Sequence, residues 1–313
     1  MNMHANSRKK PKKIIWKLFL LLLLILLVSA GIYYILPGED DFGTFLSMRN
    51  DMTRIIKDSD GAERDINLRF NDYQLKLNPL YAFMFKSGKL DLYMKSYSND
   101  KLAAISINQL EIGRDTNNFF DFTFMFRPKP EFSLPLFHGD ALKKLPGVHG
   151  ALYMDFYALN ANTDYETFFG QEIEKIEEAI HLAEPYWNHH DFGSLTPHLD
   201  PYKSPWRFEI RAPEKGDDET MRVYYSTAAR CLSLYSEAYM RSVAAWSVTS
   251  NKPINEKIKE ENRESFDGFV QVLYREDVAV KLGKMLFPEE DFDSYFLEGF
   301  WGIEPEGFLN IKD

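Results

Sequence analysis

The amino-acid sequence predicts an α/β domain in which helices cover a mainly antiparallel sheet. Segments that alternate apolar and polar residues fill the first half of the chain, and tight turns join them. Segments with helical periodicity fill the second half, and a sheet needs such helices to cover its apolar faces. Apolar residues make up 45% of the 313 residues, which is typical of a globular protein and argues against a disordered chain.

We expect a first helix at residues 42–56, and the predicted strands come after it along the chain. Turns such as Ser87-Gly88 and Ser98-Asn99-Asp100 are too short for a parallel crossover, so they favour antiparallel pairing. By these patterns we predict strands at 65–77, 80–85, 89–97, 102–110, 119–126, 151–159 and 206–211.

The helix predictions come from apolar spacing and from the residues at helix ends. In the helix predicted at 172–183, Ile173, Ile176 and Ile180 fall on one face, with acidic residues opposite them. The helix predicted at 278–287 ends before Pro288, because proline cannot continue a helix. We predict these helices at 172–183, 218–247, 255–275 and 278–287.

The N-terminal segment at 18–36 contains 19 residues without a charge, close to the roughly 20 that span a bilayer as a helix. Six basic residues precede it, which favours a single-pass anchor with the N-terminus in the cytoplasm. The alternative is a signal sequence that is cleaved at about Ala30, which would lead to a plastid. We therefore divide the chain into a basic tail at 1–17, this segment, a linker with the first helix at 37–64, and a folded domain at 65–313.

Charge and cysteine content exclude several classes of function. After the basic tail the chain holds 31 basic and 47 acidic residues, a net charge of −16, which disfavours general binding to nucleic acid. The single cysteine, Cys231, excludes an internal disulfide and a cysteine-ligated metal site. Neither a glycine-rich nucleotide loop nor a metalloprotease motif occurs. We therefore predict no bound cofactor and no metal.

Two acidic residues are candidates for proton transfer. Asp140 follows an apolar strand and a proline-rich loop, and Phe137, His138 and Gly139 precede it. In such a setting a carboxyl is partly desolvated, which raises its pKa and suits it to donate a proton. Asp277 stands at the start of a short helix. A cap on that helix is the alternative role of Asp277, and a turn cap is the alternative role of Asp140.

Two stretches of the chain resemble the ferredoxin-dependent bilin reductases. The first is Phe124 to Asp140, with its strand, proline loop and Leu-Pro-x-Phe-x-x-Asp ending, and it continues to a strand that ends at Asp155. The second runs from Asp277 to Phe287 and into the segment after it. The resemblance covers about residues 65–303. The red chlorophyll catabolite reductases share this fold, and residues 201–211 resemble them as well.

This resemblance implies a three-layer α/β/α sandwich with a central antiparallel sheet, and an enzyme that reduces an open-chain tetrapyrrole of the biliverdin type. Electrons would come singly from ferredoxin, and Asp140 and Asp277 would donate protons or hold the pigment from opposite sides. The implied pigment-binding residues are Asn108, Thr123, Phe137, His138 and Arg211. A basic patch for ferredoxin would consist of Arg127, Lys129, Lys143 and Lys144.

Some positions differ from the family pattern. The biliverdin-to-phycocyanobilin enzymes have a catalytic histidine and a glutamate on neighbouring strands. In this chain the position of the histidine falls near Thr123 and that of the glutamate near Asn108, and Val280 replaces a family arginine. These differences favour a phycoerythrobilin-type, phytochromobilin-type or red chlorophyll catabolite reductase. Two alternatives stay open: a membrane-tethered tetrapyrrole-binding protein without catalysis, and an unrelated anchored domain with an interaction role.

Overall fold

The computed structural model describes residues 42–63, 73–76, 79, 82, 89–112, 119–145, 148–159, 163–187, 197–213, 217–249, 256–304, 307 and 311. The membrane or signal segment at 18–36 lies outside these residues, as do most of the strands expected at 65–77 and 80–85. Within the described ranges, no helix combines the length and hydropathy that a bilayer crossing needs.

The described strands form one antiparallel sheet with the order β1-β3-β4-β5-β6-β7-β8, and β2 also pairs with β3. Neighbours in this sheet are mostly neighbours in the sequence, as the short connections predicted. The bounds are β1 (Ala62–Glu63), β2 (Tyr73–Lys76), β3 (Lys89–Ser98), β4 (Leu102–Ile112), β5 (Phe119–Pro128), β6 (Leu136–Leu145), β7 (Val148–Tyr157) and β8 (Phe208–Arg211).

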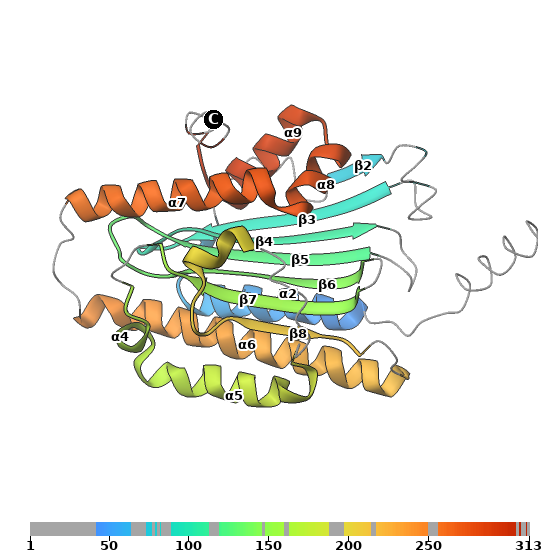
Figure 1. Cartoon of the computed structure of the whole chain (residues 1–313), viewed down its shortest axis with the longest axis horizontal. Coiled ribbons are helices and arrows are strands. Elements are labelled where there is room, and N and C mark those ends of the chain that lie inside the picture. The colour runs from blue at the N-terminus through green and yellow to red at the C-terminus, as the bar shows by residue number, and fades with distance from the viewer. Residues whose placement is uncertain are drawn as a thin grey trace, which may run out of the picture. The chain divides into compact units, whose positions relative to one another are not determined.

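Helices cover both faces of the sheet (Figure 1). One layer contains α2 (Phe42–Asp58), α4 (Tyr165–Phe169), α5 (Ile173–Ala183) and α6 (Asp218–Thr249). The other contains α7 (Glu256–Glu276), α8 (Val278–Leu286), α9 (Glu289–Asp293) and the π-helical η5 (Ser294–Phe300). Short 3-10 turns are η2 (Gly170–Glu172), η3 (Glu184–Tyr186) and η4 (Pro197–Tyr202). The predicted α/β class with an antiparallel sheet is confirmed.

Each face of the sheet has its own hydrophobic core. On β5 the side chains of Phe122, Phe124 and Phe126 pack with α2, α5 and α6, and we call this side the α6 face. Met125 on the same strand packs instead with α7, α8 and η5, on what we call the α7 face. Successive side chains of a strand point to opposite faces, so β5 contributes to both cores in alternation.

Strand β6 was not among the predictions, because the sequence there was interpreted as a proline-rich loop that ends at Asp140. The loop ends earlier, and Asp140 lies in the middle of β6, paired with β5 on one side and β7 on the other. Glycine and aspartate are rare in strands, so residues 138–140 gave no local strand signal. Pairing with two long neighbouring strands decides their conformation.

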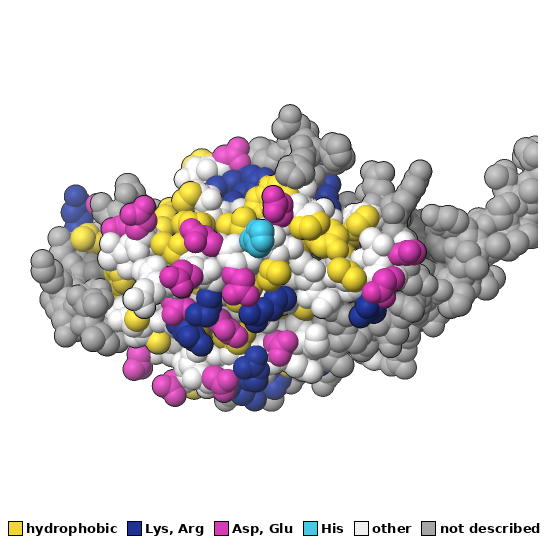
Figure 2. Space-filling view, turned by 90° about the horizontal axis from the view of Figure 1, so that it is seen from below, with side chains coloured by type: hydrophobic (Ala, Val, Ile, Leu, Met, Phe, Trp, Pro, Cys, Tyr) yellow, Lys and Arg dark blue, Asp and Glu magenta, His cyan; other side chains and the backbone are white. Residues whose placement is uncertain are grey.

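The outer surface of α5 and α6 carries interspersed acids and bases (Figure 2). Two exposed ion pairs of these helices are Arg230 with Glu178 at 3.0 Å and Arg222 with Glu219 at 2.5 Å. Exposed pairs of this kind contribute little to stability. The mixture leaves no block of a single charge on this view of the molecule.

Candidate functional site

A row of directly opposed residues crosses the α7 face of the sheet. Because the strands pair in register, five polar side chains from five strands stand side by side in it. Neighbouring strands lie about 4.8 Å apart, so the first three members fall within about 10 Å of one another. The row consists of Asn108, Thr123, Asp140, Tyr153 and Glu209. The structure thus brings together three residues that the sequence had singled out far apart along the chain.

Two carboxyl groups lie near the centre of this row. Asp140 is partly buried, and burial raises its pKa to about 6, although a hydrogen bond with Thr123 acts in the opposite direction. Asp121 lies two residues before Thr123 on β5, and the Thr123 hydroxyl donates to its Oδ1 at 3.1 Å. Burial and the nearby Asp140 raise the pKa of Asp121 well above its usual range. Carboxyls that keep a proton near neutral pH are suited to general acid chemistry.

The layer of helices above the row contributes Asp277 and Tyr295. Asp277 lies between α7 and α8, and its Oδ1 accepts a hydrogen bond from the Val280 backbone at 3.1 Å, so it caps α8 as the alternative interpretation predicted. Its charge also raises the pKa of Asp121 and of His138, which places it near both. The cap therefore fixes a carboxyl on the helix side of the site.

Tyr295 is buried on η5, and its ring stacks on Phe287 with centroids 5.2 Å apart. It hydrogen-bonds Asn108, and the charges of Asp121 and Asp140 add to the effect of burial in raising its pKa. A phenol is therefore held in its neutral form over the carboxyl pair.

His138 lies on β6, two residues before Asp140 and on the same face. Its ring stacks on Trp301 with centroids 5.7 Å apart, and 8% of the residue is exposed. Burial lowers the pKa of the imidazole to about 4, so it is neutral at physiological pH. Its Nδ1 has no hydrogen-bond partner, and the same holds for Oδ1 of Asn108. Buried polar atoms in this condition are uncommon and indicate a missing hydrogen-bonding group.

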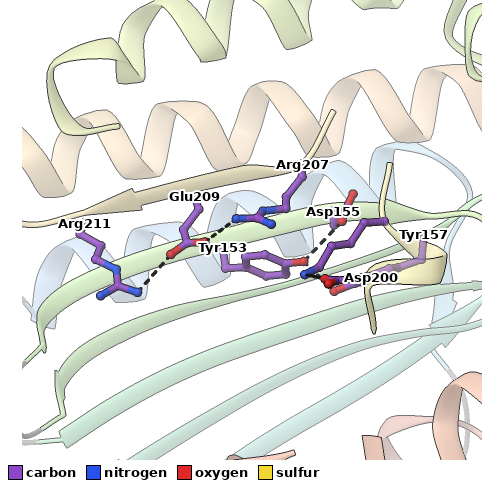
Figure 3. A network of polar contacts seen from close by, with 8 residues as sticks. Tyr153, Asp155, Tyr157, Asp200, Arg207, Glu209 and Arg211 are labelled. Atoms are coloured by element: carbon purple, nitrogen blue, oxygen red, sulfur yellow. Dashed lines mark hydrogen bonds and ion pairs between the residues drawn. The ribbon is translucent and has the colours of Figure 1, made fainter. Parts of the chain in front are cut away.

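A second polar cluster lies beside the row, on β7 and β8 (Figure 3). Asp155 is fully buried, and its Oδ1 accepts from the Ser204 hydroxyl at 2.6 Å and from the backbone of Ser204 at 3.2 Å and of Phe156 at 2.8 Å. The Tyr153 hydroxyl lies 3.4 Å from Oδ2 of Asp155 and 2.8 Å from the Tyr157 hydroxyl. This cluster ties the loop before β8 to the sheet.

Arg211 lies on β8, on the same face as the row. It donates to Glu209 at 3.2 Å, and Arg207 donates to the other carboxyl oxygen of Glu209 at 3.1 Å (Figure 3). Two guanidinium groups around one carboxylate leave a net positive charge at this edge of the sheet. That charge could hold an anionic group, so Arg211 keeps its place among the candidate binding residues.

The cluster allows a prediction on pH and stability. Burial raises the pKa of Asp155 to about 6, whereas an unfolded aspartate has a pKa of about 3.9. The folded state therefore holds more protons between these values, so Asp155 stabilises the fold most below pH 4 and loses this contribution as the pH rises to 6. We expect Asp155→Asn to be more stable than the wild type at pH 7, by at most about 3 kcal/mol.

Urea denaturation at pH 4 and pH 7 would measure this effect. The amide oxygen can accept the same three hydrogen bonds, so the two proteins should differ little at pH 4 and clearly at pH 7. Equal stability at pH 7 would contradict the pKa shift.

One of the expected residues, Phe137, does not lie on this face of the sheet. Phe137 points into the α6 face, where its ring lies 4.8 Å from Phe156 and 5.0 Å from Phe124. It is adjacent to His138 on the strand, so the two side chains point in opposite directions. Phe137 therefore lies on the opposite face of the sheet from His138 and Asp140, behind the candidate site.

Two members of the predicted basic patch, Arg127 and Lys143, lie at opposite ends of the β5–β6 pair. Arg127 lies near the end of β5 and donates to the backbone oxygens of Trp301 and Gly302 at 3.0 and 2.7 Å. Lys143 is 6% exposed and pairs with Phe120 at the other end of β5. Seven residues of strand separate the two positions, or about 20 Å. The side chain of Lys144 lies outside the described residues.

Sequence reasoning missed Asp121, Tyr295 and the pair Asp155–Ser204. Residues 119–126 are mostly apolar, and this composition hides a strict alternation. Phenylalanine occupies 120, 122, 124 and 126, whereas Asp121, Thr123 and Met125 lie between them. A period of two would have placed Asp121 and Thr123 on one face.

Comparison with known proteins supports the fold. No protein-family model and no curated protein matches the sequence. Among solved structures, the chain matches phytochromobilin synthase from tomato in complex with biliverdin, with a TM-score of 0.58 and 15% identity. The match covers 84% of this chain and 86% of that one. The fold that the sequence resemblance implied is confirmed: the described domain has the fold of phytochromobilin synthase.

Proposed function

We propose that this protein reduces an open-chain tetrapyrrole of the biliverdin type, with ferredoxin as electron donor. The observation that carries the proposal is the set of carboxyls on the α7 face, in a fold shared with a biliverdin complex. Asp140 approaches from the sheet and Asp277 from the helix layer, so a flat pigment between them would meet an acid on each side. Electrons would arrive one at a time, and each must be matched by a proton.

The site supplies the remaining requirements for such a reaction. Asn108 and His138 each offer a buried polar atom that lacks a partner, and pyrrole nitrogens and lactam oxygens can complete such hydrogen bonds. At the edge of the sheet, Arg207 and Arg211 supply positive charge suited to carboxylates of the pigment. The pigment would thus be oriented by neutral donors in the middle and by cations at one end.

A pigment assay tests the proposal. We expect the full chain with biliverdin, ferredoxin, ferredoxin reductase and NADPH to shift the absorption spectrum of the pigment, with a reduced bilin as the product. The control is the same reaction mixture without ferredoxin, because the spectrum of biliverdin also changes when the pigment binds to the protein. No reduction of biliverdin, dihydrobiliverdin or red chlorophyll catabolite would contradict the proposed function.

A second candidate function is binding of a tetrapyrrole without reduction. It is favoured by Thr123 beside Asp140 and by Asn108 beside Thr123, because both side chains are uncharged. In this case the protein would bind biliverdin without turnover, and Asp140→Asn would leave the affinity and the spectrum unchanged. An interaction domain unrelated to pigments would bind none of these compounds at micromolar concentration.

We also propose that residues 18–36 anchor the protein in a membrane, on the basis of their length and their basic flank. Mass spectrometry of the mature N-terminus separates this proposal from a cleaved signal sequence. We expect a chain that still contains the basic tail and that alkaline carbonate does not extract from membranes. A mature chain beginning at Gly31 would overturn the anchor and favour import into a plastid.

A further inference from the structure

One hydroxyl group bridges the two carboxyls on the sheet face. Thr123 follows Asp121 by two residues on β5, and it stands directly opposite Asp140 on β6. Its Oγ1 donates to Oδ1 of Asp121 at 3.1 Å, and the same hydroxyl lowers the pKa of Asp140. The three side chains therefore lie side by side across two strands.

The carboxyl pair shares a proton. Two carboxylates in a shared, desolvated site cannot both ionise easily, and the charge of Asp140 adds to burial in raising the pKa of Asp121. One of Asp121 and Asp140 is therefore a carboxylic acid. A threonine hydroxyl can donate one hydrogen bond and accept another, so Thr123 is suited to pass that proton from one carboxyl to the other.

The surroundings keep that proton in place. Asp277 faces the pair from the helix layer and adds negative charge, and Tyr295 covers it with a neutral phenol. On the sheet, His138 is neutral and contributes no positive charge. The fourth neighbouring titratable group is Tyr153, which is opposite Asp140 on β7 and whose pKa burial raises well above its usual value. None of these groups favours the doubly ionised state.

Two further observations indicate that a ligand contacts the side chains of Asp121, Thr123 and Asp140. Asn108 is the cross-strand neighbour of Thr123, it is 4% exposed, and its Oδ1 lacks a partner. His138 is 8% exposed on the other flank, next to Asp140, and its Nδ1 lacks a partner. Both unpaired atoms belong to side chains of the same face as the carboxyl pair, so a hydrogen-bonding molecule there would satisfy them.

We propose that Asp121, Thr123 and Asp140 form a proton relay, in which Asp121 stores the proton and Asp140 delivers it to the substrate. This inference rests on the proposed function and adds Asp121 and Thr123 to it as positioning residues. When ferredoxin gives one electron to the pigment, the pigment takes one proton from Asp140, and that proton comes from Asp121 through Thr123.

The transfer begins at Asp121, which holds the proton of the pair. The carboxylate of Asp140 takes the proton of the Thr123 hydroxyl, while the Thr123 oxygen takes the proton of Asp121. The new O–H bond of Asp140 then breaks as the pigment takes the proton. The net result is one electron from ferredoxin and one proton from Asp121, which together add one hydrogen atom to the pigment. Asp121 is left as a carboxylate until solvent protonates it again.

Turnover of four variants of the full chain tests the relay. We expect Asp121→Asn and Thr123→Val each to lower kcat about 100-fold, because either change removes a proton-transfer step, whereas the affinity for biliverdin stays the same. Thr123→Ser keeps the hydroxyl and should restore most of the turnover. The double variant Asp121→Asn/Thr123→Val should be no slower than either single one, since both interrupt the same chain.

Infrared spectroscopy of the pigment-free protein gives a second readout. At pH 7 we expect the C=O band of a protonated carboxyl in the wild type and in Thr123→Ser, and its loss in Asp121→Asn/Asp140→Asn. Absence of the band in the wild type would overturn the shared proton. Normal turnover of Thr123→Val, or additive effects in the double variant, would overturn the relay. If the wild type reduces no pigment, the proposed function fails, and the infrared band still decides whether the pair shares a proton.

Discussion

Replacing Asp140 by asparagine is expected to stop pigment reduction while pigment binding survives. The amide has nearly the same shape and can keep a hydrogen bond with Thr123, but it has no acidic proton to give. General acids contribute about 100-fold to 10,000-fold in rate, so kcat should fall by at least about 100-fold. After the first electron the pigment should remain as a radical, because the matching proton is missing. Optical and electron paramagnetic resonance spectra taken after one-electron reduction would detect it.

Asp155→Asn is the matched control for this experiment. It makes the same chemical change at a buried aspartate of the next strand, where Ser204 and the backbone hold the carboxyl in place. Turnover of this variant should stay near that of the wild type. If Asp140→Asn reduced biliverdin at the normal rate, Asp140 would have no role as a proton donor.

Replacing Gly139 by alanine is expected to destabilise the sheet at the point where the site is built. A Cβ atom at this position would lie 2.5 Å from the backbone oxygen of Tyr153 and 2.6 Å from Cζ of Phe124. The oxygen belongs to the paired strand β7 and cannot rotate away, so β6 itself must shift. Overpacking of a well-packed core costs about 1–3 kcal/mol, and we expect the upper end of that range.

Urea denaturation of the variant would measure this loss. The strand shift should also displace the two residues that flank Gly139, namely His138 and Asp140, so the affinity for biliverdin should fall together with stability. Gly268→Ala in α7 is the control, because its new Cβ would meet nothing closer than the Tyr202 hydroxyl at 3.6 Å. Removing a glycine from a helix interior should stabilise the protein by about 0.5–1 kcal/mol. A stable Gly139→Ala with normal affinity would contradict the close packing of β6.

The helices of the second half could be predicted closely from the sequence. The prediction at 255–275 corresponds to α7 at Glu256–Glu276, and that at 278–287 corresponds to α8 at Val278–Leu286. Apolar spacing over several turns is a strong local signal, and the residues at helix ends add to it. Strands β3, β4, β5, β7 and β8 were predicted as well, because alternating or mostly apolar segments between turns are typical of strands.

The candidate site could be predicted only in part. Asp140 and Asp277 were predicted as candidates from the residues around them in the sequence, and the structure places them on one face of the sheet. Asp121 was missed although it contacts the same threonine as Asp140. Which residues share a face depends on register, and a shift of one residue would send Asp140 to the α6 face.

The sequence by itself determined the longer helices, five of the strands, the antiparallel pairing and two of the acids, because these depend on periodicity and on turns that span a few residues. The tertiary structure alone decided that residues 136–145 form a strand, that Phe137 lies behind the site, and that Asp121 and Asp140 are both neighbours of Thr123. These features depend on contacts between strands that are paired in space, and the free energy of such contacts outweighs the local preference of any one residue.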